Sequence, residues 1–162
     1  MPARSVPARD DRFAIRVGAL GALLAGLAAL AISGCGAERE VVVPVGCKTG
    51  PEALRRALED APAGVSLQGT PLSDCVASAS DQADLQTVGV SFVDVAADLA
   101  SGARTRPEGP EALQLGYLVG AARSGAVPGI HDELVRRLEQ ELTGVDTGSR
   151  AFKRGEQAGR EG

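Results

Sequence analysis

An apolar seam in the middle of the chain is the feature that most constrains the fold. Between residues 85 and 99, large apolar side chains recur at steps of three and four residues: Leu85, Val88, Phe92, Val95 and Leu99. This spacing predicts an amphipathic helix of about 20 residues, with a narrow face for a partner helix. Gly102 is placed to end it. The sequence therefore favours a helical bundle.

A second helix is predicted from Pro110 over "PEALQLGYLVGAARSG". A glycine inside a helix costs about 1 kcal/mol relative to alanine, so the two glycines spaced by four residues need a compensating contact. We expect another backbone to pack closely on the face formed by Gly116, Tyr117 and Gly120. That backbone belongs either to this bundle or to a helix of a second copy or another protein. Membrane helices also use Gly-x-x-x-Gly, but the apolar stretch here is too short to span a bilayer.

Two more helices complete the predicted domain. Ile130, Leu134, Leu138 and Leu142 step by four and predict a third main helix over "GIHDELVRRLEQEL". A short helix is predicted over Thr49 to Pro62, ending at that proline. A turn rich in Gly, Thr and Pro follows it. From Gly144 onward the chain is rich in Gly, Arg and Glu, and we expect a disordered tail over residues 144–162.

The N-terminal part of the chain has the plan of an export signal. The run "VGALGALLAGLAALAI" over residues 17–32 has no charged side chain and is shorter than the roughly 20 residues of a typical membrane span. Four basic residues precede it: Arg4, Arg9, Arg12 and Arg16. The acidic pair Asp10 and Asp11 dilutes this positive charge without reversing it.

The end of the apolar run resembles the lipobox of bacterial lipoproteins, in the order Ile32, Ser33, Gly34, Cys35. The resemblance covers about the first 36 residues. It implies cleavage after Gly34, a diacylglyceryl thioether on Cys35, and attachment to the extracytoplasmic face of the membrane. Two or three acyl chains give stable anchoring where one does not. The alternatives are an ordinary secretory peptide with an incidental cysteine, or an uncleaved anchor.

The two cysteines that remain after such cleavage, Cys47 and Cys75, predict a disulfide, because exported proteins are oxidised. Closing a loop of about 28 residues contributes roughly 3 to 4 kcal/mol by the chain-entropy estimate. A redox or metal pair is the alternative, but the spacing is far from Cys-x-x-Cys. Before Cys47, the segment "VVVPVGC" favours extended backbone, and Pro44 limits it to a sheet edge or an extended packed segment.

The predicted fold class is all-α: a small bundle of three main helices and one short helix, with an extended N-terminal segment held by the disulfide. The predicted organisation has four parts: a removed signal peptide (1–34), a lipid-anchored tether and extended segment (35–46), a helical domain (47–143) and the tail (144–162). Apart from the lipid on Cys35, no cofactor is expected.

Composition argues against two classes of function, binding of nucleic acid and binding of sugars. The chain after Gly34 has 13 basic and 19 acidic residues, which gives a net charge of about −6. This negative charge is unfavourable for binding to nucleic acid. Aromatic residues make up 2% of the chain, so rings for stacking sugars are scarce. The core must be built from Ala, Val and Leu.

Catalytic and metal sites are not indicated. The single histidine, His131, adjoins Asp132 and Glu133, but consecutive helical residues point about 100° apart and do not converge on one ion. "GCKTG" resembles part of a phosphate loop, yet Cys47 stands where glycine is needed. Paired carboxylates along the helices are typical of solvated faces.

These observations favour a non-enzymatic cell-envelope lipoprotein that acts as a protein-interaction module, with an envelope protein or a second copy as its partner. A carrier of a small apolar ligand between the helices is the alternative. An enzyme is the third hypothesis, since no catalytic residues are identified.

Overall fold

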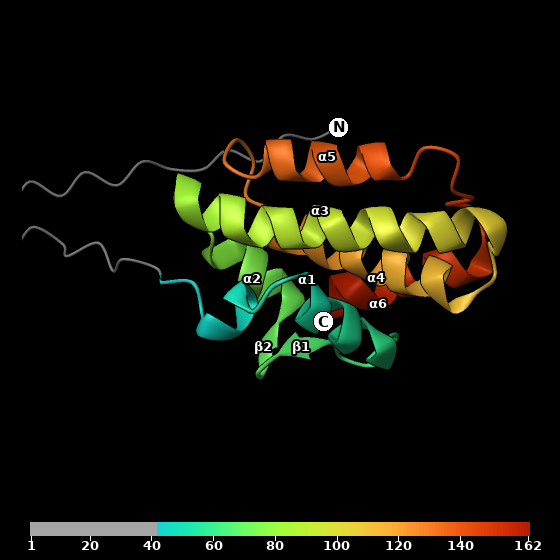
Figure 1. Cartoon of the computed structure of the whole chain (residues 1–162), viewed down its shortest axis with the longest axis horizontal. Helices are drawn as coiled ribbons and strands as arrows, with labels where there is room; N and C mark the ends of the chain where they lie inside the picture. The colour runs from blue at the N-terminus through green and yellow to red at the C-terminus, as the bar shows by residue number, and fades with distance from the viewer. Residues whose placement is uncertain (1–41) are drawn as a thin grey trace, which may run out of the picture. The chain divides into compact units, whose positions relative to one another are not determined.

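The computed structural model describes residues 42–162, which are mostly helical with one small β-hairpin (Figure 1). The predicted signal peptide, the lipobox and Cys35 lie outside the described residues. The helices and strands, in chain order, are η1 (Val45–Lys48), α1 (Pro51–Ala57), η2 (Leu58–Asp60), β1 (Ser66–Leu67), β2 (Thr70–Pro71), α2 (Leu72–Ser78), α3 (Gln82–Thr105), α4 (Pro110–Gly125), α5 (Asp132–Glu141) and α6 (Arg150–Glu161).

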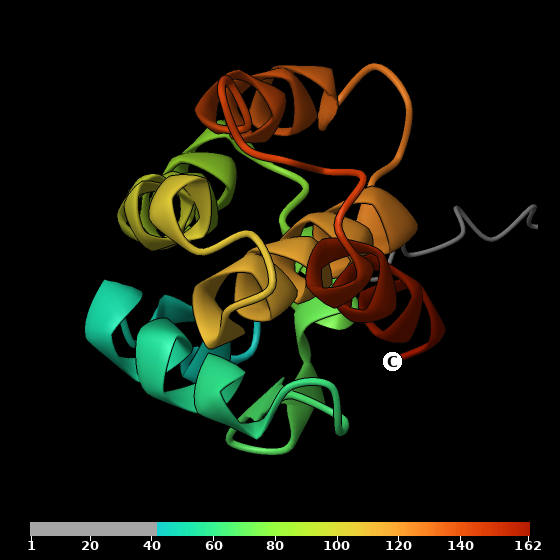
Figure 2. The ribbon, with the colours of Figure 1, turned by 90° about the vertical axis from the view of Figure 1, so that its right-hand side faces the viewer.

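Helix α4 is the centre of the domain. Its residues 115–122 are all buried, and Figure 2 shows α1, α3 and α6 arranged around it. A helix that is covered on every side has no solvated face, which is why apolar and small residues occur all around α4 rather than in one stripe. Pro110 occupies the first turn, as the sequence predicted, where a missing N–H costs nothing.

Helix α3 follows the predicted seam but is longer than expected. It begins at an Asp81 cap, whose carboxylate accepts from the Asp84 N–H at 2.8 Å, and it continues to Thr105. Val88, Phe92 and other seam residues are buried. The prediction that Gly102 ends the helix is wrong. This glycine instead lies against the Glu111 side chain of α4, at a point where a Cβ would meet Glu111 Cγ at 2.7 Å.

The disulfide between Cys47 and Cys75 is present, with the two Cα atoms 5.4 Å apart. Cys47 lies in η1, so the segment after Pro44 is a 3-10 turn rather than an extended one. Cys75 lies on α2, a helix of seven residues that the sequence did not reveal because a glycine and a proline come just before it. The predicted turn before α2 is a hairpin between β1 and β2, whose central residues Gln68 and Gly69 both have positive φ.

The expectation of a disordered tail over residues 144–162 is wrong, because residues 150–161 form helix α6. The Ser149 hydroxyl caps it by accepting from the Phe152 N–H at 3.2 Å. The Glu108 carboxylate also accepts from the first two N–H groups of the helix, at 3.1 and 3.2 Å. Phe152, Gly155 and Gly159 are its buried residues, so one narrow face is enough to order a helix that is otherwise polar.

Helices α4 and α6 pack through glycines on both sides. A Cβ on Gly116 or Gly120 would overlap carbonyl oxygens of α6, and a Cβ on Gly155 or Gly159 would overlap carbonyl oxygens of α4. Residue numbers increase together along the contact, so the two helices run parallel. The face of Gly116 and Gly120 is therefore covered by this chain's own α6. Of the two alternatives expected for this face, close packing within the bundle is the one that the structure shows, and the face is not open to a second copy or another protein.

Tyr117 is also internal to the domain. Its side chain is 1% exposed, and its hydroxyl accepts from the Val65 N–H at 3.0 Å. This bond connects the middle of α4 to the loop that leads into β1. Tyr117 is thus a core residue and not part of an open partner face.

Helix α5 covers α3 on the side away from α1. It is shorter than predicted, because Ile130 precedes it and Leu142 follows it. Leu134 and Leu138 are its buried residues. The Arg104 guanidinium of α3 donates to the carbonyls of Glu141 and Thr143, at 2.9 Å each. These bonds satisfy carbonyls that the end of a helix leaves without partners.

Candidate functional site

A groove of about 530 Å³ runs between α3 and α5. Figure 1 shows the two helices side by side along the upper part of the domain. They are parallel, since Gly89 faces Leu134 near one end and Arg104 binds Glu141 at the other. The groove is lined by residues of both helices: Gln82, Leu85, Gln86, Gly89, Val90, Val93 and Asp94 from α3, and Ile130, Glu133, Leu134 and Arg137 from the α5 side.

The floor of the groove is apolar because of a row of residues spaced by four along α3. Leu85, Gly89 and Val93 share one face of the helix, and the glycine in the middle leaves a depression between two larger side chains. Leu134 of α5 lies opposite, with its Cδ1 3.6 Å from the position of a Cβ on Gly89. The depression thus follows from the missing side chain at residue 89.

The α3 rim is the next row of the same helix, formed by Gln82, Gln86, Val90 and Asp94. Val90 is 49% exposed, and across the groove Ile130 is 41% exposed. Among the described residues, Asp94 has no ion-pair partner. Sequence reasoning missed this site, although an apolar residue at position 90 beside the seam was a readable signal of a second, unburied stripe.

The α5 side of the groove carries a cluster of one acidic and two basic side chains, with a net charge of +1. The Glu133 carboxylate accepts from Arg136 at 2.7 and 2.8 Å and from Arg137 at 2.8 Å. These hydrogen bonds, with the positive charges of the two arginines, lower the pKa of Glu133 from 4.5 to about 2. They also raise the pKa of Arg136. Glu133 is fully charged at neutral pH, so this rim presents an organised ion-pair cluster to any occupant.

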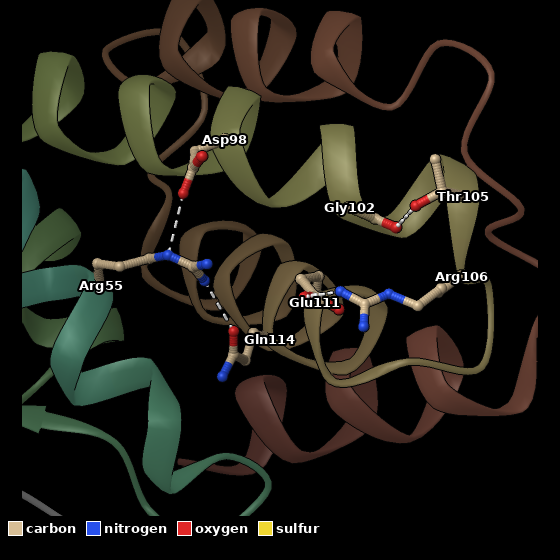
Figure 3. A network of polar contacts seen from close by, with 7 residues as sticks. All are labelled: Arg55, Asp98, Gly102, Thr105, Arg106, Glu111 and Gln114. Carbon is tan, nitrogen blue, oxygen red and sulfur yellow. Dashed lines mark hydrogen bonds and ion pairs between the residues drawn. The ribbon is translucent and has the colours of Figure 1, made fainter.

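A separate polar network joins α1, α3 and α4 below the groove (Figure 3). Arg55 of α1 forms an ion pair with Asp98 at 3.0 Å and donates to the Gln114 side-chain oxygen at 2.9 Å. Arg106 pairs with Glu111 at the far end of the network. We assign the contacts of Arg55 to packing of α1 on the bundle, and the Arg106–Glu111 pair to the connection between α3 and α4. Among the described residues, the Glu111 Oε2 atom is buried without a hydrogen-bond partner.

His131 has a structural role. It is 1% exposed, its Nδ1 accepts from the Val127 N–H at 2.8 Å, and its Nε2 lies 2.9 Å from the Ala79 carbonyl oxygen. Since Nδ1 accepts, the ring proton is on Nε2 and is donated to Ala79. The ring therefore connects the α4–α5 turn to the residues before α3.

Two further observations concern the described part of the chain. No three His, Cys, Asp or Glu side chains between residues 42 and 162 group closely enough to hold a metal ion. None of the helices in that range combines the length and hydropathy of a membrane span. Of the residues singled out from the sequence, Cys47 and Cys75 are joined, Gly116 and Gly120 pack on α6, and Gly34 and Cys35 lie outside the described range.

No protein-family model matches this chain, and comparisons with curated proteins and with solved structures found no match.

Proposed function

We propose that this chain is a cell-envelope lipoprotein, attached through Cys35 to the extracytoplasmic face of the membrane, whose helical domain is a non-enzymatic protein-interaction module. The groove between α3 and α5 is the observation that supports an interaction surface. The lipobox residues support the anchor. The Cys47–Cys75 disulfide supports an oxidising compartment, since disulfides persist outside the cytoplasm.

The proposed occupant of the groove is an amphipathic helix of another envelope protein. A floor whose residues repeat every four positions, one helical turn apart, matches a helix that presents aliphatic side chains at the same interval. The exposed Val90 and Ile130 would be covered by such a helix. A basic residue on the partner would meet Asp94, which has no ion-pair partner among residues 42–162.

The groove favours this reading over a ligand cavity inside the bundle. A carrier needs space between helices, and the Ala- and Gly-rich faces of α4 and α6 leave none where their glycines meet the opposite backbone. The groove itself has a volume within the range of small-molecule sites, about 300 to 1,000 Å³. An apolar ligand at that site is therefore the alternative outcome of the experiment below.

In-cell photo-crosslinking from two positions on α3 tests the interaction module. A photoreactive amino acid at Val90 lies on the groove, and one at Ser101 lies on the exposed surface of the same helix beyond it. We expect one discrete protein adduct from position 90 that is absent from position 101. Ile130→Glu should abolish it, because a charge at the groove mouth must be desolvated on binding.

Identical adducts from both positions, or an adduct that survives Ile130→Glu, would contradict the groove as the binding surface. A bound small molecule in the purified protein, without any groove-dependent adduct, would support the carrier instead. The anchor is tested separately by Cys35→Ala. The share of the protein in the membrane fraction should fall, and the added mass of the lipid should be absent from the peptide that contains residue 35.

A further inference from the structure

The exposed aliphatic side chains of the domain gather at one end. Five large hydrophobic residues of the described chain are substantially exposed: Val42, Val45, Val90, Val127 and Ile130. Monomeric proteins expose single apolar side chains routinely, so their number is ordinary. Their common location is the informative observation.

Two contacts place four of these residues at the N-terminal end of α3, and Val90 lies about two turns farther along that helix. Lys48 of η1 forms an ion pair with Asp84 in the first turn of α3 at 2.6 Å, which positions Val42 and Val45 there. His131 binds Ala79, three residues before α3 begins, and so positions the turn that carries Val127 and Ile130. Figure 1 shows η1 and the α4–α5 turn at the same, left-hand end of the domain.

This is also the end at which the chain arrives from the lipid-modified cysteine. Seven residue steps separate Cys35 from Val42, and a fully extended chain covers at most about 3.6 Å per residue, or roughly 25 Å in all. Helix α3 has 24 residues and is therefore about 36 Å long. Whatever its conformation, the tether is shorter than the domain, so a lipid on Cys35 keeps the η1 end nearest to the bilayer.

Charge does not explain the exposed side chains at this end. Lys48 is engaged by Asp84, and Asp81 and Asp132 add negative charge close by. Attraction of basic residues to anionic headgroups is thus not the force that acts here. Val42 and Val45 are 72% and 77% exposed, and removing such apolar surface from water is favourable by about 25 cal/mol per Å².

We propose that the η1 end of the domain rests on the lipid surface, with Val42 and Val45 in the interfacial region. The inference depends on the proposed anchor at Cys35. Its consequence for function is orientation: the groove begins at Gln82, within one turn of Asp84, so it opens beside the membrane. The partner helix that binds in the groove would then be part of a membrane protein and lie close to the bilayer.

Tryptophan fluorescence tests this directly, because the chain contains no tryptophan. Val45→Trp reports on the η1 end. Ser101→Trp reports on exposed surface of α3, roughly 28 Å from the first residue of that helix. The lipidated protein, purified from membranes, is placed in phosphatidylcholine vesicles. We expect blue-shifted emission and quenching by brominated lipid for Val45→Trp, and neither for Ser101→Trp. Equal behaviour of the two variants would overturn the proposal.

A longer tether separates surface affinity from simple confinement. With 20 Gly and Ser residues inserted after Glu40, quenching at Val45→Trp should persist, and adding Val42→Ser should reduce it. Loss of quenching on insertion alone would show that the surface has no affinity for lipid and would overturn the proposal. Replacing part of the phosphatidylcholine with phosphatidylglycerol should not increase quenching, and an increase would contradict the apolar contact.

The mass of the same protein distinguishes failure of the proposed anchor from failure of the proposed lipid contact. A chain without lipid on residue 35 would refute both the proposed anchor and this inference. A lipidated chain without quenching at Val45→Trp would refute the inference and leave the anchored interaction module standing.

Discussion

Gly155 of α6 lies against Leu113 of α4 so closely that a Cβ on the glycine would overlap the Leu113 carbonyl oxygen. The relation is reciprocal, since Gly116 of α4 is covered in the same way by the Phe152 carbonyl. Two backbones in direct contact gain dispersion energy along their whole length, and any side chain at these positions would force them apart.

Gly155→Ala should therefore destabilise the domain by about 1 to 3 kcal/mol. The methyl group overpacks the contact, and this cost is larger than the stabilisation that comes from the higher helix propensity of alanine. The free energy of unfolding in urea measures this. Gly89→Ala is the matched control: it is also inside a helix, but its Cβ would meet the nearest atom at an ordinary 3.6 Å. That variant should be more stable by about 0.5 to 1 kcal/mol. The same loss from both would contradict backbone contact as the cause.

His131→Phe should cost about 2 to 4 kcal/mol. The ring would still fill its space, but the part-buried Val127 N–H and the buried Ala79 carbonyl would lose their partners, and an unsatisfied buried group costs about 1 to 3 kcal/mol. Urea unfolding gives the difference. Asp132→Asn, at the adjacent exposed position, serves as the control and should change stability little. Wild-type stability of His131→Phe would show that the ring nitrogens are dispensable.

Removal of the disulfide by Cys47→Ala with Cys75→Ala should lower stability by roughly 3 to 4 kcal/mol, as expected for releasing a loop of 28 residues in the unfolded chain. The expected observation is a lower urea midpoint for the variant than for the oxidised protein. Reduction of the wild type should have a similar effect. A double variant within 1 kcal/mol of the wild type would contradict the role of the disulfide.

Glu133 should make stability sensitive to acid. Its pKa is about 2 in the folded protein and 4.5 for an unperturbed group, so the folded state favours the charged carboxylate. The stabilising contribution is complete above pH 4.5 and is lost as the pH falls toward 2. Glu133→Gln should remove this part of the dependence. Titration of the Glu133 carboxyl by NMR measures the pKa, which added salt should raise because the pair is exposed. Titration near 4.5 at low salt would contradict the ion-pair cluster.

Local patterns predicted those elements whose apolar face is continuous along the sequence. The α3 seam, the start of α4 at Pro110 and the leucines of α5 are each visible as a periodic row. The disulfide followed from the pair of cysteines that remains when Cys35, one of the three in the chain, is assigned to the lipid. These features depend on residues close together in the chain or on chemistry that is independent of geometry.

Elements whose order depends on distant contacts were missed. Helix α6 has one large apolar residue, Phe152, and its sequence is otherwise typical of a solvated tail. Its two buried glycines stabilise the helix only when α4 packs against them. The short α2 is likewise determined by its disulfide and by burial beneath the bundle. No local pattern distinguishes such segments from loops, because their stabilising partners are far away in the sequence.

The sequence by itself determined a helical domain with one disulfide, and it carries the pattern from which the lipid anchor is proposed. Only the tertiary structure decided which helix covers the glycines of α4, and that decision moved the candidate interaction surface from α4 to the groove between α3 and α5. The physical reason is that periodicity reports that a face must be buried without reporting against what. A depression such as the one at Gly89 exists only when a second helix supplies its other wall.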